Sequence, residues 1–333
     1  MVLNCAVVGT GFIGEMHLKA IEKIEDYNIV AVADTNETTG KKAAVDFNCA
    51  FYTDAEEMLK NENIDVVHIC LPTSLHEKFV LLCAQYKKHV LCEKPFTLTF
   101  ESVQRMVSAC EEAGVKLMIA QAARWWPEFA KIKEMYEQGD FGDLHMVYCN
   151  RLAQYPNWTS WHRDPKNSGG GLFDMNSHNI DYLYSLFGPV ESVYAVGWKC
   201  PSGCWNHVIS TLTFKNGVKA VDEGSNEIVG DFPFTISLRM TGDNGTLDYK
   251  FTAGFNIENL DAASAQTIFF EKDKPAQKLE FSEVDAIEAE TRDYINAIRN
   301  GTPLPVPIEE SVEVTKVVLA IQESLETGKL IVM

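Results

Sequence analysis

Short apolar runs alternate with helical patterns from residue 3 to about residue 120, and this alternation restricts the possible folds most strongly. The runs at residues 5–8 and 66–71 are apolar almost throughout. Strands covered by helices on both faces have this composition, because neither face meets water. Strands that alternate with helices in this way form βαβ units around a parallel sheet. We therefore predict an α/β Rossmann domain with a doubly wound parallel sheet over residues 1–122.

The pattern changes after residue 122. Asn216-Gly217 and Asn244-Gly245 are typical of tight hairpins, and the alternation at 234–240 indicates a sheet with one free face. Residues 123–333 are thus predicted as an α+β domain with an open, mainly antiparallel sheet. Its free face is a candidate subunit interface, with exposure to solvent as the alternative. The predicted helices cover 127–138, 171–187, 284–300 and 308–327, and the strands lie near 144–151, 190–199, 205–214, 217–226, 233–242, 245–250 and 266–271. Packing of the C-terminal helix back on the Rossmann domain stays open.

Composition and charge exclude several classes of protein. The 333-residue chain has no apolar stretch near the ~18 to 20 residues of a membrane-spanning helix. Its formal charge of -18 disfavours nucleic acid and anionic membranes, so we expect a small-molecule partner. The nine scattered cysteines and the absence of a signal-peptide pattern predict a cytoplasmic protein. Cys200 and Cys204 form the one close pair, which favours a reduced loop over a zinc site that would need two more ligands.

A glycine-rich turn follows the first predicted strand and opens the first predicted helix. Gly9, Gly11 and Gly14 can form the tight turn, admit a pyrophosphate and allow close helix packing. Asp34 ends the second strand, about 20 residues further on, where a carboxylate accepts hydrogen bonds from ribose hydroxyls. Because Asp34 repels a 2'-phosphate and no cation follows it, NAD is preferred over NADP. The alternative is a glycine turn without a ligand.

The predicted parallel strands end in polar residues at the edge where open α/β sheets bind ligands. Lys94 follows the fifth strand directly and is expected to point into the crevice, with a solvated surface lysine as the alternative. His76 could instead lie on a helix surface. The candidate cofactor contacts of the whole domain are Gly9, Gly11, Phe12, Ile13, Gly14, Asp34, Leu71, Pro72, Thr73, His76, Glu93, Lys94 and Gln121.

The predicted helix over 171–187 carries a second polar group. At ~100° per residue, Asp174, His178, Asp181 and Ser185 fall on one stripe of this helix. A carboxylate one turn from an imidazole can orient it for proton exchange with a substrate. The alternatives are a solvated helix face and a metal site built from Asp174, His178 and Asp181, and we expect no metal.

Aromatic and basic residues crowd two loops of the second domain. Aromatic faces with polar tips suit a sugar ring, but they equally suit a domain interface. These residues are Arg124, Trp125 and Trp126 after the last Rossmann strand, and Tyr155, Trp158, Trp161, His162 and Arg163 before the glycines at 169–171.

Three motifs together resemble the Gfo/Idh/MocA oxidoreductases: the glycine turn at 9–14, Cys92-Glu93-Lys94-Pro95, and the segment 169–181 with Asp174, His178 and Asp181. The likeness spans nearly the whole chain. It implies a Rossmann domain, a second domain for substrate binding and oligomerisation, and NAD(P)-dependent redox chemistry on sugars or cyclitols. It also implies homodimers or homotetramers formed through the open sheet, and it suggests a cis peptide bond before Pro95.

The resemblance also assigns roles to residues. Lys94, Asp174 and His178 match the catalytic Lys, Asp and His of the inositol-dehydrogenase-like members. Asn176 stands where many members have glycine, and Asn179 where some have aspartate. The candidate substrate contacts are Lys94, Arg124, Trp126, Trp161, Arg163, Asp174 and His178.

We therefore expect an NAD-dependent dehydrogenase that transfers a hydride between a secondary alcohol and the nicotinamide. A related alternative is a glycosidase in which oxidation is transient, which would release an aglycone without net NADH. An alternative from another class is a non-catalytic NAD-binding regulatory protein, against which the retained Lys94, Asp174 and His178 argue.

Overall fold

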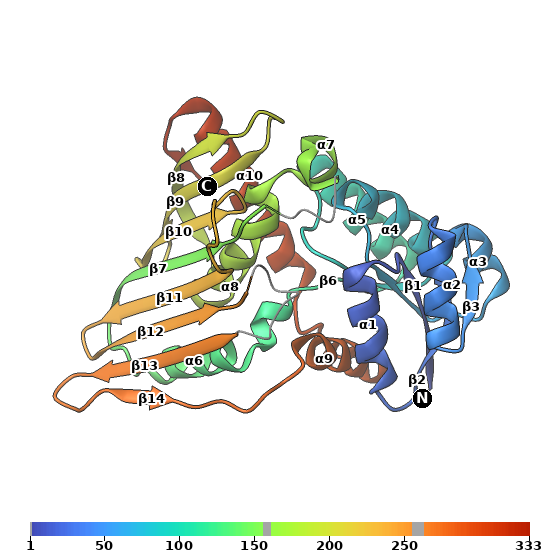
Figure 1. Ribbon diagram of the computed structural model, residues 1–333, viewed down its shortest axis with the longest axis horizontal. Helices are drawn as coiled ribbons and strands as arrows, with labels where there is room; N and C mark the ends of the chain where they lie inside the picture. Colours follow the sequence, from blue (N-terminus) through green and yellow to red (C-terminus); the bar gives the residue numbers. More distant parts are fainter. Residues whose placement is uncertain (1, 156–160, 255–262) are drawn as a thin grey trace. The chain divides into compact units, whose positions relative to one another are not determined.

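The computed structural model describes residues 2–155, 161–254 and 263–333, and the chain divides into two compact units (Figure 1). The first unit comprises Met1–Trp125 and Val284–Val312, and the second comprises Trp126–Glu283 and Glu313–Met333. A single boundary after residue 122 does not describe this division, because the segment 284–312 returns to the first unit. Each unit is described by itself below.

The first unit contains a parallel sheet, as the apolar runs predict. Its strand order within the described residues is β3-β2-β1-β4-β5-β6, and every neighbouring pair is parallel. The strands are β1 (Leu3–Val8), β2 (Tyr27–Ala33), β3 (Ala50–Tyr52), β4 (Val66–Ile69), β5 (His89–Cys92) and β6 (Leu117–Ile119). The helices are α1 (Phe12–Glu22), α2 (Glu37–Asp46), α3 (Ala55–Asn61), α4 (His76–Gln85), α5 (Phe100–Ala113) and α9 (Ala286–Asn300).

Helices cover both faces of this sheet, which explains its apolar strands. One core cluster contains Leu18 and Ile21 of α1 together with Tyr294 of α9. The other contains Met58 of α3 and Met106 of α5, on the opposite face of the strands. The segment 284–312 thus contributes to both cores of this unit, with Tyr294 and Ile295 in the first and Ile308 and Val312 packed against the second.

The second unit contains a mixed sheet of order β14-β13-β12-β11-β7-β10-β9-β8-β15 among the described residues. All neighbouring pairs are antiparallel except β7 and β10, which run parallel. The predicted mainly antiparallel sheet is therefore confirmed, whereas β14 and β15 have no counterpart in the predictions. The strands are β7 (Leu144–Leu152), β8 (Val190–Lys199), β9 (Trp205–Phe214), β10 (Lys219–Ser225), β11 (Thr235–Gly242), β12 (Gly245–Thr252), β13 (Ser264–Glu271), β14 (Gln277–Leu279) and β15 (Ile331–Val332).

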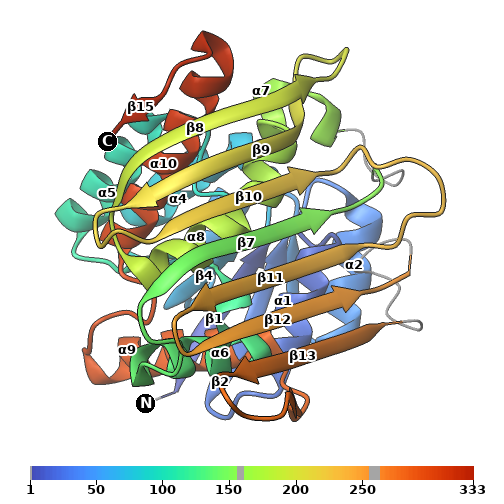
Figure 2. The same cartoon turned by 90° about the vertical axis from the view of Figure 1, so that its left-hand side faces the viewer.

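One face of the second sheet packs against helices, and the other is open (Figure 2). The alternation predicted for 234–240 is present in β11, where Ile236, Leu238 and Met240 are buried and Arg239 is exposed. The second unit's helical segments are α6 (Pro127–Gln138), α7 (Pro165–Ser168), the π-helical turn η4 (Leu172–Asn176), α8 (Ser177–Phe187) and most of α10 (Ile308–Thr327). Among the described residues, none of the helices combines the length and the apolar composition needed to span a membrane.

Candidate functional site

The glycine turn between β1 and α1 has little room for side chains at two of its three glycines. Gly9 has a φ of +92°, and a Cβ there would lie 2.3 Å from the carbonyl oxygen of Cys70. A Cβ at Gly14 would lie 2.0 Å from the Gly9 carbonyl oxygen. At Gly11, by contrast, no described non-neighbouring atom lies within 4 Å of such a Cβ. The turn is therefore tight on its inner side and open at Gly11, as the approach of a pyrophosphate requires.

The helix that follows this turn begins at Phe12, with Gly11 as its N-cap. No side chain of the described residues caps it, so its first N–H groups remain for an anion. Phe12 is exposed and Ile13 is half-buried. The turn and the first turn of α1 thus fit a dinucleotide phosphate.

Asp34 lies just beyond β2 and is held in place by the glycine turn. Its Oδ2 accepts hydrogen bonds from the amide and the hydroxyl of Thr10, at 2.8 and 2.7 Å. Its Oδ1 accepts a hydrogen bond from the amide of Asn36 at 2.7 Å. Because a carboxylate can accept about four hydrogen bonds, the fixed group retains capacity for a ribose hydroxyl.

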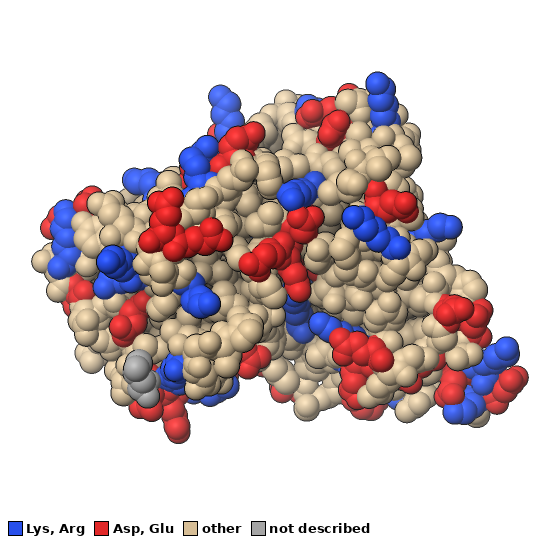
Figure 3. Space-filling view, turned by 180° about the vertical axis from the view of Figure 1, so that it is seen from behind, with Lys and Arg blue, Asp and Glu red and all other residues tan. Residues whose placement is uncertain are grey.

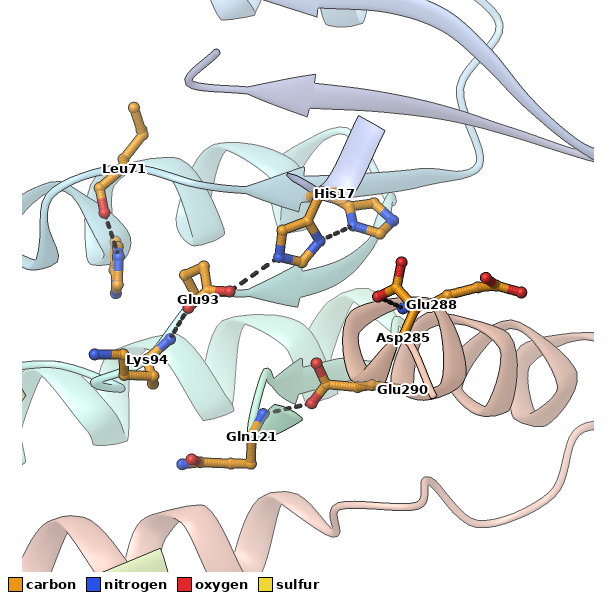
Figure 4. Close-up of polar contacts among 10 residues, drawn as sticks. His17, Leu71, Glu93, Lys94, Gln121, Asp285, Glu288 and Glu290 are labelled. Carbon is orange, nitrogen blue, oxygen red and sulfur yellow. Dashed lines mark hydrogen bonds and ion pairs between the residues drawn. The ribbon is translucent and has the colours of Figure 1, made fainter. Parts of the chain in front are cut away.

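Glu93 and Lys94 follow β5 at the carboxyl edge of the first sheet (Figure 4). Glu93 accepts hydrogen bonds through Oε1 from His17 Nε2, at 2.9 Å, and through Oε2 from the Lys94 amide, at 3.1 Å. The peptide bond between Lys94 and Pro95 is cis. The amide of Lys94 is therefore hydrogen-bonded to the Glu93 carboxylate, which the buried His17 in turn fixes.

A buried chain of polar rings supports Glu93 and was missed by the sequence reasoning. His17 Nδ1 lies 3.0 Å from His68 Nδ1, and His68 Nε2 lies 2.7 Å from the hydroxyl of Tyr27. Burial lowers the pKa of His68 well below its usual value, so His68 is neutral. With Glu93 ionised, one set of donors satisfies the chain: Tyr27 donates to His68, His68 to His17, and His17 to Glu93. Two features of the sequence could have indicated this chain: His68 lies within an apolar strand, and His17 lies on the buried face of α1.

The pKa of Glu93 shows the result of this support. Burial alone would raise it, but the hydrogen bond and the electrostatic interaction with His17, and after them the positive charge of Lys94, outweigh burial and lower the pKa below the ordinary value. Glu93 is therefore an anion at neutral pH, next to the lysine that the sequence singled out.

His76 connects two segments of the same edge. Its ring is buried, with Nε2 2.8 Å from the Leu71 carbonyl oxygen and Nδ1 3.0 Å from that of Pro95. Burial lowers the pKa of this imidazole. The alternative of a helix-surface histidine is wrong, because the ring joins the segment after β4 to the segment after β5. Pro72 is half-buried beside Leu71, and Thr73 is buried.

Gln121 and Arg124 follow β6 and are both held by the returning segment of the first unit. The amide of Gln121 donates to the carboxylate of Glu290, a fully buried residue of α9 (Figure 4). Arg124 Nη1 donates to Glu310 Oε2 at 2.7 Å. Any substrate contact by Arg124 would therefore involve a guanidinium that already has a carboxylate partner.

The segment that carries Asp174 and His178 is not the regular helix that was predicted over 171–187. It begins as the π-helical turn η4 and becomes α-helical at Ser177. A π-turn has i→i+5 hydrogen bonds, so the assumed 100° per residue does not hold between Asp174 and His178. Both side chains are half-buried, but Asp181 is fully buried. The prediction of a regular helix is thus wrong for Leu172–Asn176, and the burial of these side chains contradicts the alternative of a solvated helix face.

A buried carboxylate in β10 contacts this segment and was also missed. Asp222 accepts a hydrogen bond from Asn176 Nδ2 through Oδ2 and one from Asn179 Nδ2 through Oδ1, each at 2.7 Å. Burial raises its pKa to about 6, against the opposing effect of the two amide hydrogen bonds. One feature of the sequence could have indicated it: Asp222 shares the buried face of its strand with Ala220 and Gly224.

Arg151 of β7 supplies a buried positive charge that interacts with the carboxylates of Asp174 and Asp222. Burial lowers its pKa to about 10, and charge on Tyr249, Asp174 and Asp222 opposes this lowering. Its guanidinium carbon lies 5.8 Å from the centre of the Trp126 ring. The guanidinium therefore stays protonated at neutral pH, and its charge opposes the rise in the pKa of Asp222 that burial causes.

The predicted aromatic contacts form two groups in the second unit. Trp126 stacks on Phe129, with 5.7 Å between the ring centres. Trp161 stacks on His162 at 3.7 Å, and the guanidinium of Arg163 lies 4.3 Å from the centre of the Tyr155 ring. Trp158 lies outside the described residues.

Potential metal ligands are dispersed among the described residues, and charged side chains are dispersed over the face that Figure 3 shows. No three His, Cys, Asp or Glu side chains among them cluster as metal ligands, and Asp174, His178 and Asp181 form no such site. Acidic and basic side chains are interspersed over the face that Figure 3 shows.

Two family models match the chain in the places that the geometry indicates. Residues 3–121 match the model described as "Oxidoreductase family, NAD-binding Rossmann fold", and residues 129–248 match the "GFO/IDH/MocA C-terminal domain".

Relatives and solved structures extend this likeness over the whole chain. Myo-inositol 2-dehydrogenase of Thermotoga maritima is 27% identical, with 97% of this chain and 96% of that protein covered. The NADP-dependent scyllo-inositol 2-dehydrogenase of Bacillus subtilis is 30% identical over 74% of this chain and 75% of its own. The WlbA dehydrogenase from Bordetella pertussis, crystallised with NADH and UDP-GlcNAcA, superposes with a TM-score of 0.84 at 24% identity, covering 100% of this chain and 99% of that one.

Proposed function

Because this chain belongs to the Gfo/Idh/MocA family of oxidoreductases, we propose that it is an NAD-dependent dehydrogenase acting on a secondary alcohol of a sugar, sugar derivative or cyclitol. Dehydrogenases of CH–OH groups are prominent among its relatives, and two of them are named for inositols. The observation that carries the proposal is the position of Lys94: it follows β5 at the ligand-binding edge of a domain whose glycine turn fits a dinucleotide.

Three side chains have distinct roles in the proposed reaction. The nicotinamide, when bound, supplies the acceptor for the hydride. His178 takes the proton of the substrate hydroxyl, and Asp174 orients the imidazole and stabilises its charged form. Lys94 donates a hydrogen bond to the substrate oxygen, where negative charge develops as the proton leaves. Trp126 and Trp161 offer ring faces to the substrate, and Arg124 and Arg163 offer donors for its hydroxyls.

NAD is the proposed cofactor, in preference to NADP. Gly9, Gly11 and Gly14 would hold its pyrophosphate, and Asp34 would accept hydrogen bonds from its ribose. The carboxylate of Asp34 would repel a 2'-phosphate, and Thr35 and Asn36 bring no positive charge to offset it. The remaining proposed contacts are Phe12, Ile13, Leu71, Pro72, Thr73, His76, Glu93, Lys94 and Gln121.

A homodimer or homotetramer formed through the open sheet face is also proposed. Met146, Tyr194, Val196, Trp198 and Phe270 project from strands of this sheet, and each is between 40% and 51% exposed. Large apolar side chains on one open face favour a protein interface over solvent. A cytoplasmic location stays a prediction. Its support is that none of the nine cysteines forms a disulfide within the described residues.

The proposal is tested by following NADH absorbance with NAD and a panel of inositols, aldoses, amino sugars and sugar acids. We expect NAD reduction with at least one member, and at least a tenfold lower kcat/KM with NADP. Binding of NAD in a thermal-shift assay without turnover on the whole panel would favour the regulatory alternative. Release of an aglycone from glycosides without net NADH would favour the transient-oxidation glycosidase.

A further inference from the structure

Asp222 joins both sides of the point at which the helical geometry changes. Asn176 is the last residue of the π-helical turn η4, and Asn179 lies in the first turn of α8. The two oxygens of the Asp222 carboxylate hold one amide each, at 2.7 Å. His178 lies between the two asparagines in the sequence, and Asp174 lies two residues before the first. Two contacts to one rigid group therefore restrain the rotation of this segment as well as its distance from β10.

The surrounding strands are adapted to this contact. A Cβ at Gly224 of β10 would lie 2.2 Å from Asn176 Oδ1, so only glycine admits the asparagine at this position. Cys149, the partner of Asp222 in β7, places its Sγ 3.5 Å from Asp222 Oδ1. Asp222, Asn176 and Asn179 are all buried, with 0%, 0% and 6% of their surface exposed. Water therefore offers the two amides little alternative to the carboxylate.

A π-turn needs such restraint more than a regular helix does. The π-helical hydrogen-bond pattern is less favourable than the α-helical one. Single π-turns therefore persist where the surrounding structure fixes them, often at functional sites. Hydrogen bonds to an ionised carboxylate are about twice as strong as neutral ones. Burying Asp222 is also costly for the fold, so a purely structural role would be served better by an apolar residue.

We propose that Asp222 is a positioning residue: by holding Asn176 and Asn179 it fixes the π-turn, and with it the directions in which Asp174 and His178 project. This inference rests on the proposed function, in which these two side chains handle the substrate proton. Asp222 itself touches no reacting atom in this scheme. Its effect should appear in kcat and in the state of the His178 imidazole, and not in the binding of NAD.

The test compares three variants with the wild-type protein. Asp222→Ala removes both acceptors. The double variant Asp222→Asn with Asn176→Asp reverses the polarity of one hydrogen bond and keeps both, because the amide introduced on β10 can donate to the carboxylate introduced on η4 and still accept from Asn179. Ser210→Ala is the matched control: Ser210 is fully buried, lies directly opposite Asp222 on β9, and its hydroxyl has no hydrogen-bond partner among the described residues.

The Kd for NAD is measured on each protein, together with two further readouts. The first is kcat on the panel compound that the wild type oxidises. The second is the set of ¹⁵N chemical shifts of the His178 ring, assigned by their loss in His178→Asn. We expect Asp222→Ala to lower kcat about tenfold or more and to shift the His178 resonances, with the Kd for NAD unchanged within about twofold. The double variant should return kcat to within about threefold of the wild type and restore the resonances, and Ser210→Ala should match the wild type.

Wild-type kcat and wild-type His178 resonances in Asp222→Ala would overturn the proposal. A folded double variant as slow as Asp222→Ala would overturn it as well. If Asp222→Ala does not fold, Asn179→Ala removes a single hydrogen bond and must still shift the His178 resonances. If the wild type oxidises no compound of the panel, the proposed function fails, while the resonances still decide whether Asp222 positions His178.

Discussion

The ring of His17 donates a hydrogen bond to Glu93, with 2.9 Å between Nε2 and Oε1. This bond joins α1, the helix that follows the glycine turn, to the residue that precedes Lys94. The proposed phosphate site and the proposed catalytic lysine are therefore linked inside one unit. A change at either end of this bond should affect both the stability of the first unit and the position of Lys94.

Replacement of His17 by alanine should destabilise the protein mainly at neutral pH. The lowered pKa of Glu93 stabilises the fold above the ordinary carboxyl pKa, and this stabilisation is lost as the pH falls through the lowered value. Without His17, Glu93 and His68 each lose one hydrogen-bond partner, at a cost of about 1 to 3 kcal/mol at pH 7. Urea unfolding at pH 7 and pH 3.5 measures the difference, which should shrink at the lower pH. The exposed pair Lys41 and Glu37 provides the control, since Glu37→Gln should leave the unfolding curve unchanged.

Replacement of His178 by alanine should remove the proton acceptor of the proposed reaction. We expect kcat to fall by ~10²-fold or more, because general base catalysis contributes about that much, while the Kd for NAD stays nearly the same. Steady-state rates and NAD titration by fluorescence measure the two quantities. Turnover that survives the substitution would show that another group accepts the proton.

Replacement of Asp34 by asparagine should weaken the preference for NAD. Asparagine keeps one oxygen for Thr10 or for the ribose but removes the charge that repels a 2'-phosphate. We expect the ratio of the Kd values for NADP and NAD to fall by about tenfold, which corresponds to about 1.4 kcal/mol. Thermal-shift titrations with both cofactors provide the measurement. A larger shift with NADP than with NAD in the wild type would contradict the assigned preference.

Replacement of Asp222 by asparagine should change how stability depends on pH. Burial raises the pKa of Asp222 from 3.8 to about 6, so between these values the folded state binds a proton that the unfolded state has released. This group's contribution to stability therefore decreases as the pH rises from about 4 to 6, by on the order of 3 kcal/mol in total. Unfolding free energies at pH 4, 5, 6 and 7 should show a steeper decline for the wild type than for Asp222→Asn. Parallel curves would mean that Asp222 does not titrate in this range.

The first unit could be predicted closely because its signals are local. Apolar runs alternate with helical patterns, and the tight turn at 9–14 leaves no room for a side chain at Gly9 or Gly14. The prediction that Lys94 lies at the carboxyl edge of the sheet depends only on the end of β5, which the run at 89–92 marks. By contrast, the return of 284–312 to the first unit depends on contacts between segments far apart in the sequence.

The candidate site was predicted less completely, for two physical reasons. A regular helix was assumed over 171–187, but the π-turn η4 follows from tertiary contacts such as those of Asn176 and not from local periodicity. The partners Asp222 and His17 lie on other elements, and a single sequence does not indicate which buried polar groups will meet. The parallel pairing of β7 with β10 could not be predicted either, because β8 and β9 lie between these strands in the sequence and no local pattern indicates the pairing.

The space at Gly224 that admits Asn176 has a consequence for sequence divergence in this family. Neither position is free to drift alone: a methyl group on the strand would expel the amide, and removing the amide would leave a void in the interior. Homologues with glycine in place of Asn176 should therefore carry a larger residue in place of Gly224, so that the pair covaries although the two residues are far apart in the chain. Such a paired change would identify homologues that lack the contact between these two positions and hold the helix of Asp174 and His178 by other contacts.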